Sequence, residues 1–415
     1  MRIVDLFSGA GGLTFGFYYR LWKNGFVRNR KNQIIFANEF DKNAATAFMA
    51  NYPEINMLNC DIRTLTERQI NGLIGDEPVD LIIGGPPCQS YSTVGARCYD
   101  DKAMMYTEYS RILNIVRPKM FLFENVKGIL SMRETFYKLD EDGNIVYEET
   151  KNPKKQSKKP RKRPVVERYG DLIIDKIKMS FSNIEDNFGY NIVYKILNAV
   201  DYGVPESRER VFIIGIRKDL NIKWKFPKPS EATHISIKEA IDDLPVLKEN
   251  QHIANYTTPA QNVYQTLMRK GSAQLTQHYC GIYGDKIRTV IENVQQGQGK
   301  EDFNALVDAG VIAEEYRLTS GYANTYGRLI ENQPSPTITN NMTTPSALRC
   351  IHYSQNRALS PREGARIQSF PDWFQFSGEK EHVTKQIGNA VPPLLAIAIA
   401  KQIERTLREE HPENE

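Results

Sequence analysis

The sequence lacks any run of apolar residues that approaches the roughly 20 needed for a membrane-spanning helix. It also has few cysteines for its 415 residues: Cys60, Cys88, Cys98, Cys280 and Cys350 are scattered, and none forms a Cys-x-x-Cys pair. That spacing argues against a disulfide framework and against a structural zinc site. We therefore expect a cytoplasmic protein with reduced thiols, no bound metal, no membrane anchor and no export signal.

A strong charge of one sign is also missing, because 54 Lys and Arg residues nearly balance 50 Asp and Glu residues, for a net charge of +4. So small an excess does not by itself predict a nucleic-acid partner. One segment is an exception: the chain turns polar from about 138 to 168, and Lys and Arg crowd between 151 and 163. Such a run buries too little apolar surface to order itself. It predicts a mobile basic insertion, either a solvated loop or an arm that binds phosphates.

Short apolar runs alternate with amphipathic stretches up to Arg217, which is the rhythm of βαβ units. The pattern predicts an α/β fold, in which a doubly wound, mostly parallel sheet carries helices on both faces. Strands are expected at 3–7, 34–38, 56–58, 79–83, 120–123, 191–197 and 211–216. Beyond Arg217 the rhythm is lost, and many Pro, Gly, Asn and Gln residues predict a smaller, irregular domain.

Several predicted strands end in residues that suit a ligand. The first runs into a glycine-rich turn at 5–12, where missing side chains let a ligand approach the backbone. Thr14 breaks the Gly-x-Gly-x-x-Gly pattern of a dinucleotide site, so a nucleoside without phosphates fits better. Glu39 follows the second strand, where it suits a ribose or, equally, the start of a helix, and Asp61 follows the third. Parallel strands end at one edge of a sheet, so these groups should share a crevice.

The fourth strand leads into Gly84-Gly85-Pro86-Pro87-Cys88, where two prolines hold the cysteine in a stiff turn. Taken alone, this stretch fits a buried structural thiol better than a reactive one. Glu124 ends the next strand among apolar residues, which favour its protonated form. Neighbouring strands should bring Glu124 and Cys88 together.

Two arginines, Arg208 and Arg210, precede the last predicted strand of this region. Two guanidinium groups on one side of an extended segment suit a phosphate and a base carbonyl. The alternative is a surface ladder of ion pairs with Glu206 and Glu209.

The ordered motifs GGPPCQS, FENV, Arg-x-Arg, ARIQSFPDW and QIGNAVPP make the chain similar to the DNA (cytosine-5) methyltransferase family. Tyr326-Gly327-Arg328 and the segment 334–339 resemble the pattern that closes the family's target recognition region. The resemblance spans both ends of the chain and implies a Rossmann-like methyltransferase that uses S-adenosylmethionine. One departure is Glu206, where the family usually has Gln at the head of Gln-x-Arg-x-Arg; it affects a local contact and not the chemistry.

The resemblance also implies roles for residues of this chain. Cys88 matches the nucleophile, Glu124 the acid that contacts cytosine N3, Arg210 the residue that holds O2, and Arg208 a supporting phosphate contact. Asp61 would face the adenine amino group. The positions that match cofactor contacts are Phe7, Ser8, Gly9, Ala10, Gly11, Gly12, Glu39, Phe40, Asp61, Ile62, Pro87, Asn389 and Ala390.

We expect four parts along the chain. Residues 1–218 form a catalytic and cofactor-binding domain, 219–345 a target recognition domain, 346–383 a hinge, and 384–415 a segment that returns to the catalytic domain. The expected partner is double-stranded DNA, bound by a monomer whose loop at 89–101 closes over a flipped base. Little lies beyond the catalytic core, which favours a bacterial restriction-modification enzyme at the nucleoid, with a cognate endonuclease that acts on the same site without a stable complex.

Three other functions compete with this interpretation. A tRNA cytosine-5 methyltransferase has nearly the same core, but the large irregular region before Tyr326 favours the reading of duplex grooves. A catalytically inactive DNA-binding protein would not need Cys88, Glu124 and Arg210. A nicotinamide-dependent dehydrogenase competes on fold alone. The target sequence itself cannot be read from residues 221–325.

Overall fold

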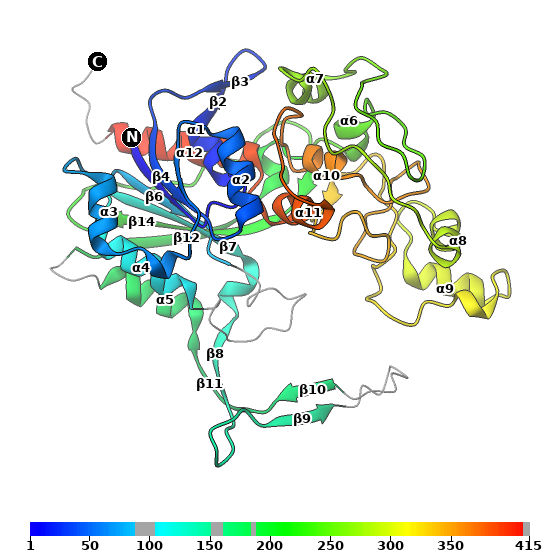
Figure 1. The fold of residues 1–415 in the computed structure, drawn as a ribbon, viewed down its shortest axis with the longest axis horizontal. Helices are drawn as coiled ribbons and strands as arrows, with labels where there is room; N and C mark the ends of the chain where they lie inside the picture. Colours follow the sequence, from blue (N-terminus) through cyan, green and yellow to red (C-terminus); the bar gives the residue numbers. More distant parts are fainter. Residues whose placement is uncertain (88–103, 151–160, 184–187, 410–415) are drawn as a thin grey trace.

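The computed structural model describes residues 1–87, 104–150, 161–183 and 188–409 (Figure 1). Its centre is a seven-stranded sheet with the order β12-β14-β7-β6-β1-β4-β5. The strands are β1 (Arg2–Leu6), β4 (Gln33–Asn38), β5 (Asn56–Leu58), β6 (Leu81–Gly84), β7 (Met120–Val126), β12 (Tyr190–Asn198) and β14 (Glu209–Arg217). The strands β5, β4, β1, β6 and β7 run parallel, and β14 and β12 pair antiparallel at one side. All seven predicted strands and the mostly parallel sheet are confirmed.

Helices cover both faces of the sheet, because successive buried strand residues point to opposite sides. Ile3 belongs to the core under α1 (Gly12–Tyr18), α2 (Lys42–Asn51) and α12 (Pro393–Glu409). Val4 belongs to the core under α3 (Glu67–Ile74), α4 (Met105–Val116) and α5 (Ile173–Ser182). The doubly wound arrangement follows directly from this alternation.

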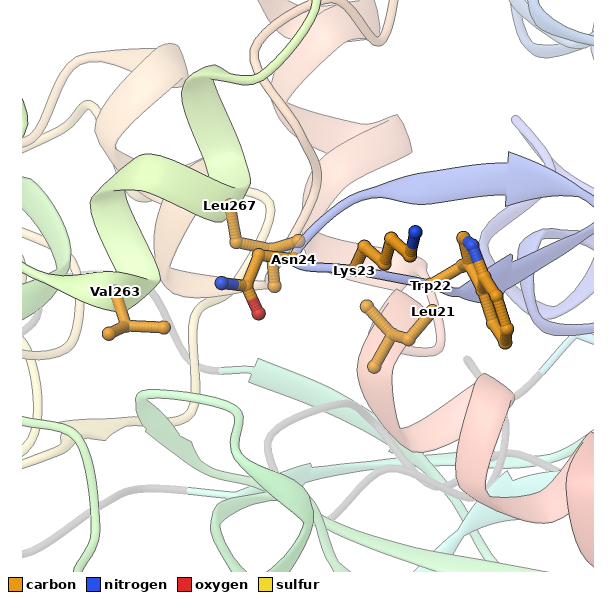
Figure 2. A pocket seen from close by; sticks show the side chains of 6 residues that line it. All are labelled: Leu21, Trp22, Lys23, Asn24, Val263 and Leu267. Carbon is orange, nitrogen blue, oxygen red and sulfur yellow. The ribbon is translucent and has the colours of Figure 1, made fainter.

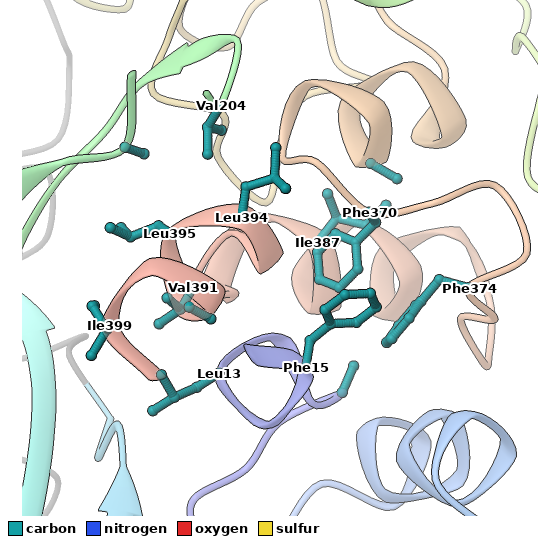
Figure 3. Close-up of a cluster of buried hydrophobic side chains, with 14 of the residues drawn as sticks. Leu13, Phe15, Val204, Phe370, Phe374, Ile387, Val391, Leu394, Leu395 and Ile399 are labelled. Carbon is teal, nitrogen blue, oxygen red and sulfur yellow. The ribbon is translucent and has the colours of Figure 1, made fainter. Parts of the chain in front are cut away.

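The C-terminal helix packs against the first helix of the chain. Figure 3 shows Leu13 of α1 beside Val391, which directly precedes α12, and Ile399 within α12. The contact is so close that a Cβ on Gly16 would lie 2.2 Å from the carbonyl carbon of Ala396. Segments from the two ends of the sequence therefore share one core.

The polar segment at 138–168 has more structure than its composition predicts. Strand β8 (Arg133–Tyr137) pairs with β11 (Val166–Leu172), and β9 (Tyr147–Thr150) pairs with β10 (Arg161–Pro164), both antiparallel. Figure 1 shows this β-ribbon projecting away from the sheet. The prediction that the segment cannot order itself is wrong for its described residues, because cross-strand hydrogen bonds satisfy a backbone that no core covers. Residues 151–160 lie outside the described part.

A second region, built from short helices and irregular chain, follows β14 (Figure 1). Its helices are α6 (Ile237–Ile241), α7 (Val263–Arg269), α8 (Asp285–Asn293), α9 (Lys300–Asp308), α10 (Pro361–Ile367) and α11 (Lys380–Asn389). It meets the sheet region through β13 (Glu206–Ser207), which pairs with β15 (Ser335–Pro336). A hairpin of β2 (Tyr19–Leu21) and β3 (Phe26–Arg28) and the 3-10 turns η1 (Ile62–Thr64), η2 (Lys127–Leu130), η4 (Ala199–Tyr202) and η5 (Glu314–Tyr316) complete the described elements.

Candidate active site

The glycine-rich turn after β1 is held in shape by Glu39. Phe7, Gly9 and Gly11 all adopt positive φ angles, of 55°, 57° and 95°. The Glu39 carboxylate accepts from the Gly9 N–H at 2.8 Å through Oε2 and from the Asp41 N–H at 2.7 Å through Oε1. Burial raises the pKa of Glu39, and these two hydrogen bonds oppose the shift. Each carboxylate oxygen keeps a further lone pair that can accept from a ligand.

The alternative role for Glu39, at the start of a helix, belongs to its neighbour. Asp41 is the residue that caps α2, accepting from the backbone N–H groups of Asn43 and Ala44 at 3.0 and 3.2 Å. Glu39 instead links the glycine turn to the segment that follows β4, and its role in holding a ligand stays a prediction.

Phe40 and Asp61 lie on the same edge in contrasting environments. The Phe40 side chain is 74 % exposed, although Asn59 Nδ2 fixes its backbone by donating to the carbonyls of Glu39 and Phe40 at 2.8 and 3.2 Å. An exposed ring on a fixed backbone suits stacking against a base. The Asp61 carboxylate binds the Arg63 guanidinium group at 2.6 Å, and these hydrogen bonds lower the pKa of Asp61. An adenine that contacts Asp61 must therefore share the carboxylate with Arg63.

Two buried groups support the glycine turn, and neither was assigned this role from the sequence. The Tyr52 hydroxyl donates to the Gly11 carbonyl at 2.6 Å. Asp5 lies fully buried beneath the turn, where the Thr14 hydroxyl donates to it. Burial, with a further contribution from Glu39, raises the pKa of Asp5 to about 7 against the effect of Thr14.

The C-terminal segment closes over the same turn. A Cβ on Gly12 would lie 2.6 Å from the Val391 carbonyl oxygen and 2.9 Å from the Cβ of Ala390. Only glycine permits this approach, which brings the predicted cofactor-contacting residues Asn389 and Ala390 beside the turn. Ile62 is buried behind it, in the core on the other face of the sheet.

A second cluster forms at the carboxyl end of β7, around Glu124. Arg210 on the adjacent β14 places its Nε 3.2 Å from Glu124 Oε1, and both side chains are largely buried. Burial raises the pKa of Glu124, while the nearby guanidinium groups of Arg210 and Arg208 lower it. The raised pKa favours a carboxyl that can donate a hydrogen bond, as its apolar flanks predict.

The turn that leads to Cys88 lies against this carboxyl group. A Cβ on Gly85 would lie 2.9 Å from Glu124 Oε2, and Asn125 Nδ2 donates to the Pro86 carbonyl at 3.2 Å. Pro87 is the last described residue of the turn. Cys88 and the predicted loop at 89–101 lie outside the described residues, so the predicted contact between Cys88 and Glu124 stays a prediction. The sequence analysis missed Asn125, although it directly follows Glu124.

The predicted phosphate contact of Arg208 is wrong for this structure. Its side chain is 0 % exposed and donates to the carbonyls of Ile338 at 3.0 Å and Gly388 at 2.7 Å. Glu206 lies 3.4 Å from it, so the ion pair considered as an alternative does form, but in the interior and not on the surface. Arg208 therefore donates its hydrogen bonds to other parts of the same protein.

Other features of the described part lie away from these clusters. A cavity of about 320 Å³ is lined by Leu21 at the end of β2, by Trp22, Lys23 and Asn24 after it, and by Val263 and Leu267 of α7 (Figure 2). It includes none of the predicted site residues. In the described residues no group of three or more His, Cys, Asp or Glu side chains is placed to hold a metal. None of the helices in the described ranges combines the length and apolar character that crossing a bilayer requires.

Residues 1–146 and 174–405 match the model of a family described as C-5 cytosine-specific DNA methylase. The chain belongs to this family. As a DNA (cytosine-5) methyltransferase it uses S-adenosylmethionine as its methyl donor. This membership excludes the nicotinamide-dependent dehydrogenase. Two stretches are unmatched: 147–173, which includes the strands β9, β10 and β11, and 406–415.

Relatives of this methylase cover it almost end to end. Type II methyltransferase M.DdeI of Desulfomicrobium norvegicum is 33% identical over 97% of this chain and 88% of its own length. Type II methyltransferase M.NgoPII of Neisseria gonorrhoeae is 32% identical over 98% of this chain and 96% of its own. The solved structure of a DNA modification methyltransferase encoded within an E. coli prophage has a TM-score of 0.68 at 24% identity, covering 98% and 99% of the two chains, which shows the same fold.

The residues at the methylase's glycine turn fit the nucleoside part of the cofactor. The turn offers close backbone approach, Glu39 offers fixed acceptors for ribose hydroxyls, and Phe40 offers an exposed ring for the adenine. No phosphate has to be bound there, which agrees with Thr14 in place of the third glycine of a dinucleotide site.

Proposed function

We propose that this methylase is the modification enzyme of a bacterial restriction-modification system and methylates one cytosine within a specific duplex sequence. The observation that carries the proposal is the buried Glu124–Arg210 pair, which lies against the turn that leads to Cys88. Similarity to type II methyltransferases over nearly the whole chain supports the biological setting. We further propose that it acts in the cytoplasm as a monomer, alongside an endonuclease that recognises the same site without binding it stably.

The proposed chemistry answers a property of cytosine, whose C5 is a poor nucleophile while the ring is conjugated. Attack of the Cys88 thiolate on C6 converts C5 into an enamine carbon. Glu124, whose pKa is raised by burial, donates to N3 in its protonated form, and Arg210 donates to O2, so both stabilise the charge that moves into the ring. Bound S-adenosylmethionine supplies the electrophilic methyl group. Transfer of the C5 proton to a water molecule and departure of the Cys88 thiolate then restore the aromatic ring.

The cofactor would be held by the glycine turn and its neighbours. We propose that Glu39 accepts from the ribose hydroxyls, that the Phe40 ring stacks on the adenine, and that Asp61 accepts from the adenine amino group beside Arg63. The backbone of residues 7–12 and the residues Ile62, Pro87, Asn389 and Ala390 would complete the pocket.

Access to C6 requires the target base to leave the duplex stack. We propose that residues 219–345 read the DNA sequence, that 346–383 form the hinge, and that 384–415 close the cofactor side of the catalytic domain. The loop at 89–101 would cover the flipped base. These assignments make duplex DNA, and not tRNA, the expected substrate.

The test compares two cysteines of one segment. Cys88→Ser should abolish both methylation of duplex DNA and covalent trapping on DNA that carries 5-fluorocytosine, because the hydroxyl does not add to C6. Cys98→Ser, the matched control, should keep both activities. Retained trapping by Cys88→Ser would refute the nucleophile assignment, and faster methyl uptake by tRNA than by duplex DNA would refute the substrate. Bisulfite sequencing of DNA from expressing cells would identify the target sequence.

A further inference from the structure

The strand that carries Arg210 is joined to the segment that follows Tyr326-Gly327-Arg328. Strand β13 pairs in parallel with β15, with Glu206 opposite Ser335. The Ser335 N–H donates to the Pro205 carbonyl at 2.9 Å, and the Thr337 hydroxyl donates to the Ser207 carbonyl at 2.9 Å. Residues 335–337 are therefore bonded to the residues that directly precede β14.

Glu206 and Arg208 hold the backbone of one residue of that segment, Ile338, at both its N–H and its carbonyl group. Glu206 Oε1 accepts from the Ile338 N–H at 2.6 Å, and Arg208 Nη1 donates to the Ile338 carbonyl at 3.0 Å. The same Nη1 lies 3.4 Å from Glu206 Oε1, and both side chains are fully buried. Because a broken buried ion pair leaves an uncompensated charge, this arrangement resists displacement of Ile338.

Arg208 also binds a third segment. Its Nη2 donates to the Gly388 carbonyl at 2.7 Å, directly before the predicted cofactor-contacting residues Asn389 and Ala390. Gly388 packs so tightly that a Cβ would lie 2.4 Å from the Asn340 nitrogen. Residues 206–208, 338–340 and 388 thus form one packed unit, which we call the Arg208 junction.

The Arg208 junction lies next to the base pocket without forming part of it. Arg208 directly precedes β14, and Arg210 is the second residue of that strand. The Arg210 Nε lies 3.2 Å from Glu124 Oε1. Glu206 and Arg208 are 0 % exposed, so neither can touch DNA in this arrangement. Any effect they have on the base must come from within the protein, through the backbone that leads to Arg210 and through the charge that Arg208 places near Glu124.

We propose that Glu206 and Arg208 are positioning residues that transmit the placement of the recognition segment 335–340 to Arg210, so that bound DNA aligns the base pocket. The inference rests on the roles proposed above for Glu124 and Arg210. Glu206 acts through Oε1, an acceptor that the amide of the family's usual Gln would also provide. Arg208 acts through two N–H groups aimed at different carbonyls, which a lysine ammonium cannot reproduce in the same geometry.

The test measures the rate of the chemical step in the full-length enzyme. Glu206→Ala and Arg208→Lys should lower the single-turnover methylation rate on duplex DNA by about ten- to 100-fold, since a displacement of about 1 Å can cost that much. The dissociation constants for the same DNA and for S-adenosylhomocysteine should stay within about threefold, because neither ligand contacts these residues directly. Glu206→Gln should keep the rate within about threefold of the unaltered enzyme, because its oxygen still accepts from Ile338.

Rates are expressed per active molecule, counted by trapping on 5-fluorocytosine DNA, so that loss of folded protein is not read as slow chemistry. The matched control is Glu363→Gln, which weakens the buried pair with Arg357 away from the base pocket. It should lower the melting temperature and leave the rate per active molecule unchanged. If Glu206→Ala fails to fold, Arg208→Lys decides.

An unchanged rate per active molecule in the junction variants would overturn the inference, as would a Glu206→Gln enzyme as slow as Glu206→Ala. Arg210→Ala, measured in parallel, separates this inference from the proposed function. A full rate with Arg210→Ala would refute the base pocket itself. A large loss with Arg210→Ala beside full rates in both junction variants would refute only the coupling.

Discussion

The two regions of this methylase satisfy their buried backbone groups in different ways. In the sheet region the strands do so, and the interior is apolar, as in β7, where Met120 to Phe123 are fully buried. In the second region buried arginines donate hydrogen bonds to many of the backbone carbonyls. Arg328 donates to the carbonyls of Ile291, Val294, His352 and Gln355, and Arg362 to those of Thr276, Pro371 and Phe374.

The reason lies in the lengths of the elements. Short helices and irregular chain leave many carbonyls without a backbone partner, and a guanidinium group offers five donors in a fixed geometry. Carboxylates accompany these cations: Arg366 binds both Asp243 and Asp372, and it lowers the pKa of Asp372. In the sheet region the buried Asp5 accepts from the Thr14 hydroxyl, and burial raises its pKa. The same residue type is thus charged in one region and inclined to be neutral in the other.

The largest effect should come from removing an arginine that holds the second region together. Arg366→Met should lower the free energy of unfolding by about 3–5 kcal/mol, because Asp243 and Asp372 would remain buried without their counter-charge. Urea denaturation measures the loss. Hydrogen exchange should rise first in the peptides around residues 240–245 and 366–372.

Lys178→Met is the control for this change, since Lys178 forms an exposed ion pair with Asp175 on α5. It should shift the free energy of unfolding by no more than about 0.5 kcal/mol. A loss below about 1 kcal/mol for Arg366→Met would show that the arginine network is not what stabilises the second region.

A smaller effect, with a defined pH dependence, should come from Asp5. Its pKa rises from 3.8 to about 7 on folding, so the folded state binds the proton more tightly than the unfolded state. The contribution of Asp5 to the free energy of unfolding is therefore complete below pH 3.8 and is lost as the pH rises through about 7. Over this range the free energy of unfolding falls by up to about 1.4 kcal/mol per pH unit. Asp5→Asn should flatten that decline in urea denaturation between pH 4 and 7. Asp142→Asn, at an exposed carboxylate of the β-ribbon, should leave the slope unchanged; equal slopes in all three proteins would contradict the prediction.

The difference between the two regions also explains what could be predicted from the sequence. The seven strands were predictable because each is a short apolar run with clear boundaries, and the ends of parallel strands place Glu39 and Glu124 without further information. The burial of Arg208 was not predictable, because Glu206 to Arg210 is a polar stretch typical of a surface. Its partners, Ile338 and Gly388, lie more than a hundred residues further along the chain.

The prediction for the β-ribbon was wrong for a related reason. Composition indicates that residues 138–168 have no core to join. It does not indicate that two polar strands can satisfy each other's backbone groups by pairing, as β9 and β10 do with Glu149 opposite Lys162. Tyr52 was missed because a tyrosine in a helical stretch gives no hint that its hydroxyl supports a glycine turn 41 residues earlier. Pairings that depend on distant segments are invisible to local patterns.

The smallest effect tests whether apolar packing also differs between the regions. Ile82→Val in β6 and Ile351→Val beside the Arg328 network each remove one methylene group from a fully buried side chain. Both should cost about 0.5–1.5 kcal/mol, because the lost contacts are alike wherever the core is tightly packed. If urea denaturation gives equal losses for the two variants, apolar packing does not differ between the regions, and the buried arginines account for the larger effect of Arg366→Met. If Ile351→Val instead costs as much as Arg366→Met, tight packing around irregular chain, and not the buried charge, is what distinguishes the second region from the sheet.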